Sequence, residues 1–175
     1  MDGITLVNYA HTNCTPMKSI TQLPEAEAFA LAAKIYAESP CRAHRRFGPD
    51  FQYYYPHRMK TEKWLYEHFI ALGGKPEAEH PFYFALHACG SLDEYFEYGT
   101  QTRLALDGID PRHISFTFGD SIAVMDSPDR RDPFTKDVLY QYITQHGHNV
   151  EQFLDSIQET YGCIEAQLWT DSYFA

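Results

Sequence analysis

The chain has 175 residues, a length that predicts one globular α+β domain spanning residues 1–175. Hydrophobic residues make up 44% of it and aromatic residues 15%, which supplies enough apolar surface for a core and excludes global disorder. The formal net charge of -10 disfavours a broad electrostatic contact with nucleic acid, because such a contact needs lysine and arginine opposite the phosphates.

The N-terminal part of the chain predicts a strand and two helices. A loosely alternating strand over residues 4–9 comes first. An alanine-rich helix follows from Pro24 to Ser39, with a proline in its first turn and acidic residues at the positive end of its dipole. Thr61 is expected to cap a second helix over residues 62–72.

Residues 41–59, between these two helices, show no clean period and are expected to be irregular. The segment combines a basic cluster, which includes Arg45 and Arg46, with an aromatic run that includes Tyr54; Arg58 follows closely. An irregular segment of this length in a compact domain is often functional. It could bind a nucleotide or another anion, or it could be a surface loop held down by its tyrosines, and the sequence leaves both interpretations open.

The C-terminal part predicts alternating strands and helices. Strands are expected over residues 80–87, 100–106, 113–118 and 162–171, and helices over residues 92–98, 136–145 and 150–161. Neighbouring strands without an intervening helix argue against a doubly wound parallel sheet. We therefore predict a mixed or mostly antiparallel sheet of about five strands flanked by about five helices.

The four cysteines lie far apart and form no C-x-x-C pair. A secreted disulfide-stabilised domain would be denser in cysteine, and a zinc site would show paired spacing, so we expect reduced thiols and no metal. The N-terminus lacks the charged and long apolar regions of a signal peptide, and no run reaches membrane-spanning length. These features predict a soluble cytoplasmic protein without a membrane partner.

The familiar enzyme motifs are missing from the sequence. It contains no G-x-G-x-x-G, Walker, H-E-x-x-H or G-x-S-x-G pattern. His113-Ile114-Ser115 matches the H-x-[ST] half-motif of two-histidine phosphoesterases, in which two such motifs supply the acid and the base. The other candidate, His11-Thr12-Asn13, is out of phase with its strand.

The last predicted strand places Glu165 and Gln167 on one face, because strand side chains alternate. On a face turned toward a cleft, this carboxylate suggests a functional site. On an outward face, it would only be the polar side of an amphipathic strand.

The order of polar residues on the strands resembles a known superfamily. His11 and Thr12 end the first strand, Tyr83 lies in a central strand, and Glu165 lies in the last. This order is similar to the ADP-ribosyltransferase superfamily, whose minimal signature is a His or Arg, then a Tyr or Ser, then a Glu on the final strand. The two helices before the last strand resemble the DNA-targeting toxin branch. The chain departs from related enzymes in lacking a Gly between His and Thr, and it lacks the E-x-E of the arginine-modifying branch.

The resemblance implies an enzyme that uses NAD to modify a macromolecular target, either protein or nucleic acid. Glu165 would orient the ribose hydroxyls and stabilise an oxocarbenium-like sugar. Tyr83 would stack on the nicotinamide ring. His11 and Thr12 would hydrogen-bond the nicotinamide ribose or amide.

The resemblance also requires an arginine for the pyrophosphate. Arg58, Arg45 or Arg46 could supply the bidentate fork, with Tyr54 as a neighbouring cofactor contact.

Two other functions stay open on the sequence alone. One is a non-catalytic binding or regulatory domain with a tyrosine-rich partner surface, and the other is a small phosphodiesterase using His113. The transferase needs His11, Tyr83 and Glu165 to converge on one cleft. The binding domain needs an exposed aromatic patch, and the phosphodiesterase needs a second histidine facing His113 across paired strands.

Overall fold

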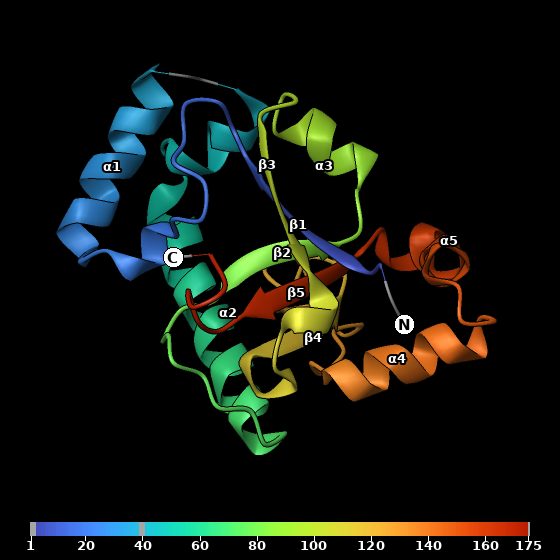
Figure 1. Cartoon of the computed structure of the whole chain (residues 1–175). Coiled ribbons are helices and arrows are strands. Elements are labelled where there is room, and N and C mark those ends of the chain that lie inside the picture. The colour runs from blue at the N-terminus through green and yellow to red at the C-terminus, as the bar shows by residue number, and fades with distance from the viewer. Residues whose placement is uncertain (1–2, 39–40, 175) are drawn as a thin grey trace.

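The computed structural model describes residues 3–38 and 41–174. Its strands form one antiparallel five-stranded sheet in the order β3-β1-β2-β5-β4 (Figure 1). The strands are β1 (Thr5–Ala10), β2 (Phe82–Leu86), β3 (Thr100–Ala105), β4 (Ile114–Phe118) and β5 (Ile164–Leu168). The prediction of an α+β domain with a mostly antiparallel sheet is confirmed.

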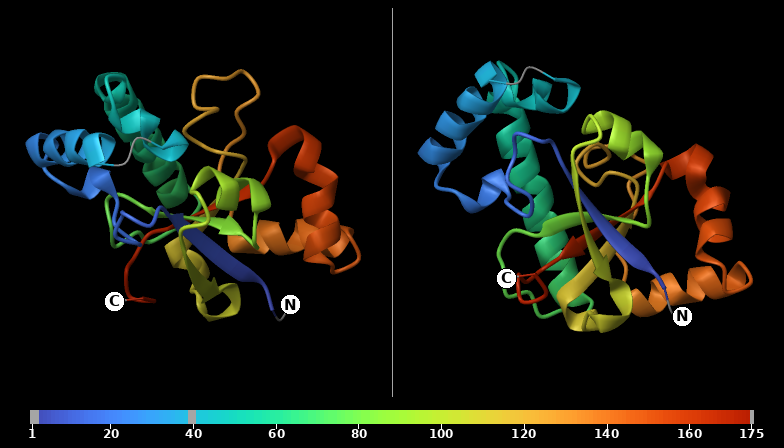
Figure 2. Two further views of the ribbon diagram at one scale, coloured as in Figure 1. Left: turned by 90° about the horizontal axis from the view of Figure 1, so that it is seen from above. Right: turned by 45° about the horizontal axis from the view of Figure 1, so that its top comes forward.

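Helices flank the sheet on two sides. The α-helices are α1 (Glu25–Glu38), α2 (Phe51–Ala71), α3 (Gly90–Tyr95), α4 (Lys136–Gln145) and α5 (Val150–Tyr161). Short 3-10 helices lie at η1 (Ile20–Gln22), η2 (Arg42–Phe47), η3 (Leu106–Gly108) and η4 (Pro111–His113). Figure 2 shows α1 and α2 on one side of the sheet and α4 and α5 on the other. None of the described helices combines the length and apolar character needed to cross a membrane.

The sheet has one apolar face and one partly polar face. On the apolar face, Phe84, Phe116 and Ala166 pack against residues of α4 and α5, such as Leu139 and Phe153, to form the main core. This burial is the main source of stability for the sheet, since apolar area removed from water stabilises by about 25 cal/mol per Å².

The second face carries polar side chains in the middle of the sheet. Tyr83 pairs with Gln167 across β2 and β5, and Glu165 pairs with Thr117 across β5 and β4. Directly opposed residues of antiparallel strands share a face, so these four side chains lie on the same side of the sheet. The prediction that Glu165 and Gln167 share one face of the last strand is confirmed by this register.

The helix α2 corrects the expectation of an irregular segment over residues 41–59. Residues Arg42–Phe47 form η2, and α2 begins at Phe51, well before the predicted start. Its buried side combines aromatic and charged residues, including Phe51, Tyr55, Arg58 and Glu62, and therefore shows no simple apolar period. Pro56 lies inside the helix. Because proline usually ends a helix, its presence is a second reason why the sequence does not predict a helix here.

The predicted cap of that helix is an interior residue. Thr61 is buried in the middle of α2, where its Oγ1 donates a hydrogen bond to the carbonyl oxygen of His57 at 3.0 Å. This bond, four residues back along the helix, is the way an interior threonine satisfies its hydroxyl.

Candidate active site

A pocket of about 590 Å³ lies on the polar face of the sheet. Its lining comes from many parts of the chain, including Asn8 of β1, Arg46 of η2, Tyr54 and Arg58 of α2, Tyr83 of β2 and Glu165 of β5. Tyr95 at the end of α3, Phe96 directly after it, and the segment after β4 also contribute to the lining. A cavity of this size with a few charged groups among apolar walls is typical of a small-molecule site.

The carboxylate of Glu165 accepts all of its described hydrogen bonds on one oxygen. The Ser121 hydroxyl donates to Oε1 at 2.5 Å, Gln167 Nε2 donates at 2.9 Å, and the Thr117 hydroxyl and the Ser121 backbone N–H donate at 3.4 Å. Ser121 follows the end of β4, so the strand and the turn after it hold Glu165 in place. The second oxygen, Oε2, has no such partner among the described residues.

A buried hydrogen-bond chain holds Gln167 in turn. Trp169 Nε1 donates to Ser115 Oγ at 3.0 Å, and Ser115 Oγ donates to Gln167 Oε1 at 2.9 Å. Gln167 Nε2 donates to Thr117 Oγ1 at 2.9 Å as well as to Glu165. Because a buried polar group without a partner is costly, this chain fixes the side chains beside Glu165 in a single arrangement.

The surroundings of Glu165 favour its protonated form. Burial, followed by the negative charge of Asp120, raises its pKa to about 8, against the lowering effect of the hydrogen bonds from Ser121 and Gln167. Near neutral pH, this raised pKa favours the neutral carboxylic acid form of Glu165. A carboxyl group tuned in this way, next to a cavity, is typical of catalytic sites.

Arg58 is fully engaged inside the protein. Its Nε donates to Glu62 Oε1 at 2.7 Å, its Nη1 to the Tyr54 hydroxyl at 3.2 Å, and its Nη2 to Ser19 Oγ at 2.9 Å. Glu62 is completely buried and also pairs with His80 Nδ1 at 2.7 Å. Burial acts to raise the pKa of Glu62, but the hydrogen bond from His80 and the charge of Arg58 outweigh it and hold that pKa below its ordinary value. Arg58 is therefore a structural ion-pair residue at the pocket wall.

Tyr83 is held by this ion pair. Its hydroxyl donates to Glu62 Oε1 at 3.3 Å, and the Arg58 guanidinium lies 5.2 Å from the centre of its ring. Burial and the Glu62 charge raise the pKa of Tyr83 well above its ordinary value, so the phenol stays neutral. The ring is thus a fixed aromatic wall of the pocket.

Arg46 is one of three cationic residues that line the pocket, with Lys18 and Arg58, and it keeps one donor unused. Its guanidinium lies between 5.0 and 5.9 Å from the ring centres of Phe47, Tyr54, Tyr95 and Phe96, and its Nη1 donates to the Tyr95 hydroxyl at 3.4 Å. Its Nε is buried without a partner among the described residues. A buried donor of this kind is expected to find a partner when an anionic ligand enters.

The structure separates the predicted site residues into two groups. Glu165, Tyr83, Arg58, Arg46 and Tyr54 line the pocket together. The other three, His11, Thr12 and Arg45, are not among the residues that line it. His11 is buried and its Nε2 lies 3.0 Å from Glu97 Oε2, while Thr12 and Arg45 are exposed.

Several residues of the site were not singled out by sequence analysis. Asp120 and Ser121 act on Glu165 from the turn after β4, Glu62 accepts a hydrogen bond from Arg58, and His80 holds Glu62. The Gly119-Asp120-Ser121 turn, directly after a cleanly alternating strand, was the available signal, since polar residues at strand ends often reach a site.

His113 lies in a different environment from that of a two-histidine phosphoesterase. Its Nδ1 is 3.0 Å from the Tyr173 hydroxyl, and its Nε2 is 3.8 Å from Glu77 Oε1. Its backbone oxygen accepts from the Trp169 N–H, and β5, the neighbour of β4, contains no histidine within its described residues 164–168.

Comparisons with protein-family models, with curated proteins and with solved structures find no match to this chain. The pocket and its residues are thus the features that bear on function.

Proposed function

We propose that the chain is an ADP-ribosyltransferase-like enzyme, which binds NAD in this pocket and transfers ADP-ribose to a macromolecular target. The observation that carries the proposal is the placement of Glu165 and Tyr83 on the neighbouring strands β5 and β2, both lining one pocket that also contains Arg46. Glu165 and Tyr83 are two of the three residues that the family resemblance assigns to the reaction. The third, His11, does not line the pocket, so the proposal rests on Glu165 and Tyr83 alone.

The reaction breaks the bond between the nicotinamide nitrogen and the ribose C1, and the bonding electrons leave with nicotinamide. The ribose becomes oxocarbenium-like, and a nucleophile of the target attacks C1 and releases its proton to water. An ionised Glu165 next to the ribose would stabilise the positive charge that develops. The hydrogen bonds on Oε1 would keep Oε2 aimed at the substrate.

The raised pKa of Glu165 fits this role through linkage with substrate binding. The nicotinamide ring of NAD is positively charged, and a buried positive charge beside a carboxyl group lowers its pKa. NAD would therefore favour release of the proton from Glu165. The enzyme would gain its catalytic charge only when the substrate is bound.

Arg46 and Tyr83 supply the remaining contacts of the proposal. Arg46 has an unused buried Nε and would meet the pyrophosphate, whereas Arg58 is already satisfied by Glu62, Tyr54 and Ser19. Tyr83, which lines the pocket, would stack on the nicotinamide ring.

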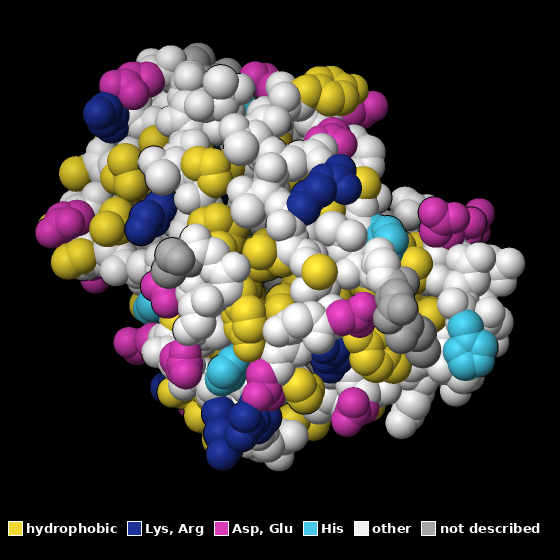
Figure 3. Space-filling model, viewed as in Figure 1, with side chains coloured by type: hydrophobic (Ala, Val, Ile, Leu, Met, Phe, Trp, Pro, Cys, Tyr) yellow, Lys and Arg dark blue, Asp and Glu magenta, His cyan; other side chains and the backbone are white. Residues whose placement is uncertain are grey.

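The surface charge favours a protein over a nucleic acid as the target. On the face seen in Figure 3, lysine and arginine side chains stand in separate small groups among acidic and uncharged ones. With a net charge of -10, the chain would repel a phosphate backbone over most of its surface. A cytoplasmic location is part of the proposal, because Cys14, Cys41, Cys89 and Cys163 are free thiols.

The test is calorimetric titration with NAD, ADP-ribose and nicotinamide, combined with measurement of nicotinamide release in a cell extract. We expect wild-type protein to bind NAD and release nicotinamide, and Glu165→Gln to bind NAD but release none. Glu159→Gln, which changes an exposed carboxylate on α5, is the matched control and should behave as wild type. Absence of binding at millimolar NAD would refute the proposal and direct attention to the partner-binding alternative.

A further inference from the structure

Two buried polar atoms that lack a partner among the described residues belong to side chains of the pocket. One is Nε of Arg46, a donor, and the other is Oδ1 of Asn8, an acceptor. A buried polar group without a hydrogen bond is costly, so each such group in a folded protein calls for a reason. The proposed function gives the Arg46 donor a partner and leaves the Asn8 acceptor without one.

Asn8 lies where the strands β1 and β2 separate. Val7 and Ala85 are the last paired residues along β1, which then runs away from β2 (Figure 1). Asn8 bridges the opening with its side chain, because its Nδ2 donates to the backbone oxygen of Tyr83 at 2.8 Å. Three consecutive residues of β1 and four of β2 line the pocket. Since consecutive strand residues point to opposite faces, the pocket reaches into the opening between the two strands.

The bond to Tyr83 also fixes which way the Asn8 amide points. A backbone carbonyl oxygen only accepts hydrogen bonds, so the atom that faces it must be the NH2 nitrogen of Asn8. Oδ1 is therefore the atom left for a ligand. A ligand group that satisfies it must present an N–H or O–H donor, whereas a carboxylate would place two acceptors against each other.

The carboxamide of nicotinamide carries a donor of this kind. In the proposed function the nicotinamide ring stacks on Tyr83, the residue whose backbone oxygen holds the Asn8 amide. The carboxamide NH2 is the hydrogen-bond donor on the ring stacked there. Asn8 and Tyr83 would thus bind the edge and the face of one ring.

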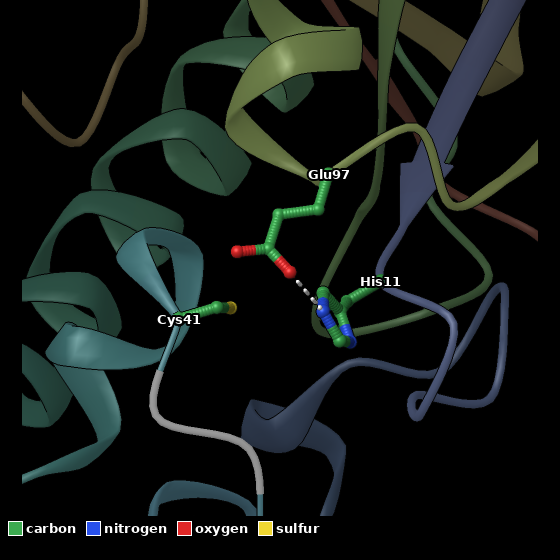
Figure 4. A group of neighbouring side chains, drawn as sticks. All are labelled: His11, Cys41 and Glu97. Atoms are coloured by element: carbon green, nitrogen blue, oxygen red, sulfur yellow. Dashed lines mark hydrogen bonds and ion pairs between the residues drawn. The ribbon is translucent and has the colours of Figure 1, made fainter.

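His11 cannot make this contact, although the family resemblance gives it a role at the nicotinamide. Figure 4 shows its ring beside Glu97, where Nε2 lies 3.0 Å from the carboxylate Oε2. Its Nδ1 accepts the Asn13 backbone N–H at 3.2 Å, so both ring nitrogens have partners. Asn8, three positions earlier in the chain, lines the pocket instead.

We propose that Asn8 selects the amide form of the pyridine ring, because its Oδ1 accepts a hydrogen bond from the carboxamide NH2. This inference rests on the proposed function and adds a specificity to it: the site takes NAD and rejects the dinucleotide whose ring carries a carboxylate. That carboxylate brings no donor to Oδ1, and it adds a negative charge to the pocket that holds Glu165. A site built around a hydrogen bond discriminates strongly, since the wrong ligand leaves its buried polar atom unpaired.

The test is calorimetric titration of the wild-type protein with four dinucleotides. NAD and its hypoxanthine analogue, which lacks the adenine NH2, both keep the carboxamide and should bind within about two-fold of each other. The 3-acetylpyridine analogue, in which a methyl group replaces the carboxamide NH2, and the nicotinic acid analogue leave Oδ1 unpaired. Each should bind about 10- to 100-fold more weakly than NAD.

The outcomes separate this inference from the proposed function. Equal affinity for NAD and for the acetylpyridine analogue would overturn the inference and leave NAD binding in place. Weakened binding of the hypoxanthine analogue alone would place adenine at Asn8 and would overturn it as well. Absence of NAD binding would refute the proposed function and this inference together.

Variants separate recognition by Asn8 from its structural bond to Tyr83. Asn8→Leu keeps a similar size without either polar atom, so the preference for NAD over the acetylpyridine analogue should shrink to within about two-fold. If Asn8 only held the strands together, this variant would weaken both ligands alike and keep the preference. Thr102→Val is the matched control, because Thr102 is directly opposite Asn8 on β3 and is not among the residues that line the pocket. It should keep the full preference, and if Asn8→Leu fails to fold, the wild-type titration still decides.

Discussion

Tyr83 and Glu165 lie diagonally across the β2–β5 pair. Tyr83 is directly opposite Gln167, and Glu165 is directly opposite Ala85, so the two side chains share a face and are offset by two residues. Such diagonal neighbours are about 7–8 Å apart, a spacing that leaves room for a ligand ring between a phenol and a carboxyl group. Ala85, the small residue opposite Glu165, also lines the pocket and keeps that space open.

The raised pKa of Glu165 predicts a specific pH dependence of stability. A carboxyl group has a pKa near 4.3 in the unfolded chain, whereas Glu165 titrates at about 8 in the folded protein. Between these values the folded state holds the extra proton, so stability falls as pH rises from about 5 to about 8 and then levels off. We expect the melting temperature of wild type minus that of Glu165→Gln to fall by several degrees over this range, since about 1 kcal/mol corresponds to about 2–4 °C.

Two variants control this measurement by thermal unfolding. Glu159→Gln should give a flat difference curve, because its carboxylate is exposed. Asp120→Asn should move the midpoint of the Glu165 transition to lower pH, because the negative charge of Asp120 helps to raise the Glu165 pKa. A wild-type difference curve that rises with pH would contradict the assignment.

The strands of the sheet could be predicted from the sequence because apolar and polar residues alternate regularly along them. Ile114, Phe116 and Phe118 face the core, and the same period placed Glu165 and Gln167 together on the other face. Alternation over a short strand depends only on local order, so each strand was found near its true place.

The start of α2 and the position of His11 could not be predicted from the sequence in the same way. The charged residues on the buried face of α2, Arg58 and Glu62, are stabilised by tertiary partners such as Ser19 and His80 that no local pattern shows. His11 follows the last residue of β1, and the turn closed by Cys14 carries it away from the sheet face. The turn after β1, rather than the order of residues along the strand, therefore places His11 outside the pocket.

The buried ion pair of Arg58 and Glu62 predicts a non-additive effect on stability. Glu62 has an exposed fraction of 0% and Arg58 of 9%. Removing one partner leaves an uncompensated buried charge, so Arg58→Met and Glu62→Leu should each lower the free energy of unfolding by about 3–5 kcal/mol. The double variant should be less destabilised than the sum of the two single variants.

Urea unfolding measures this effect, with an exposed pair as the control. Lys34 and Glu38 form an i, i+4 pair at 3.9 Å on α1 with both side chains more than half exposed. Lys34→Met should change the free energy of unfolding by no more than about 0.5 kcal/mol. Additive losses from Arg58→Met and Glu62→Leu would show that the two charges act independently.

Variants of Arg46 and Arg45 form a matched pair that tests the proposed contact with the pyrophosphate of NAD. Both are in η2, but only Arg46 lines the pocket, and Arg45 is exposed. A hydrogen bond to a charged group contributes about 1.5–3 kcal/mol, so Arg46→Met should weaken NAD binding by about 10- to 100-fold while keeping the apolar stem. Arg45→Met should leave the dissociation constant within about two-fold of wild type. Equal losses in both variants, measured by calorimetry, would point to a general charge effect.

Gly99 is expected to control the position of His11. A Cβ added at Gly99 would lie 2.2 Å from the Ala10 carbonyl oxygen and 3.0 Å from both His11 Cα and Thr12 N. These are backbone atoms that cannot rotate away, so Gly99→Ala must push the end of β1 and the following turn aside. We expect a loss of about 1–3 kcal/mol in the free energy of unfolding, typical of overpacking.

Gly90→Ala is the control for this substitution, because a Cβ at Gly90 would meet nothing within 4 Å. It begins α3, where alanine is favoured over glycine by up to about 1 kcal/mol, so this variant should be as stable as wild type or more so. Thermal unfolding of both variants tests the expectation. If Gly99→Ala is as stable as wild type, the close approach of Gly99 to residues 10–12 does not constrain the chain.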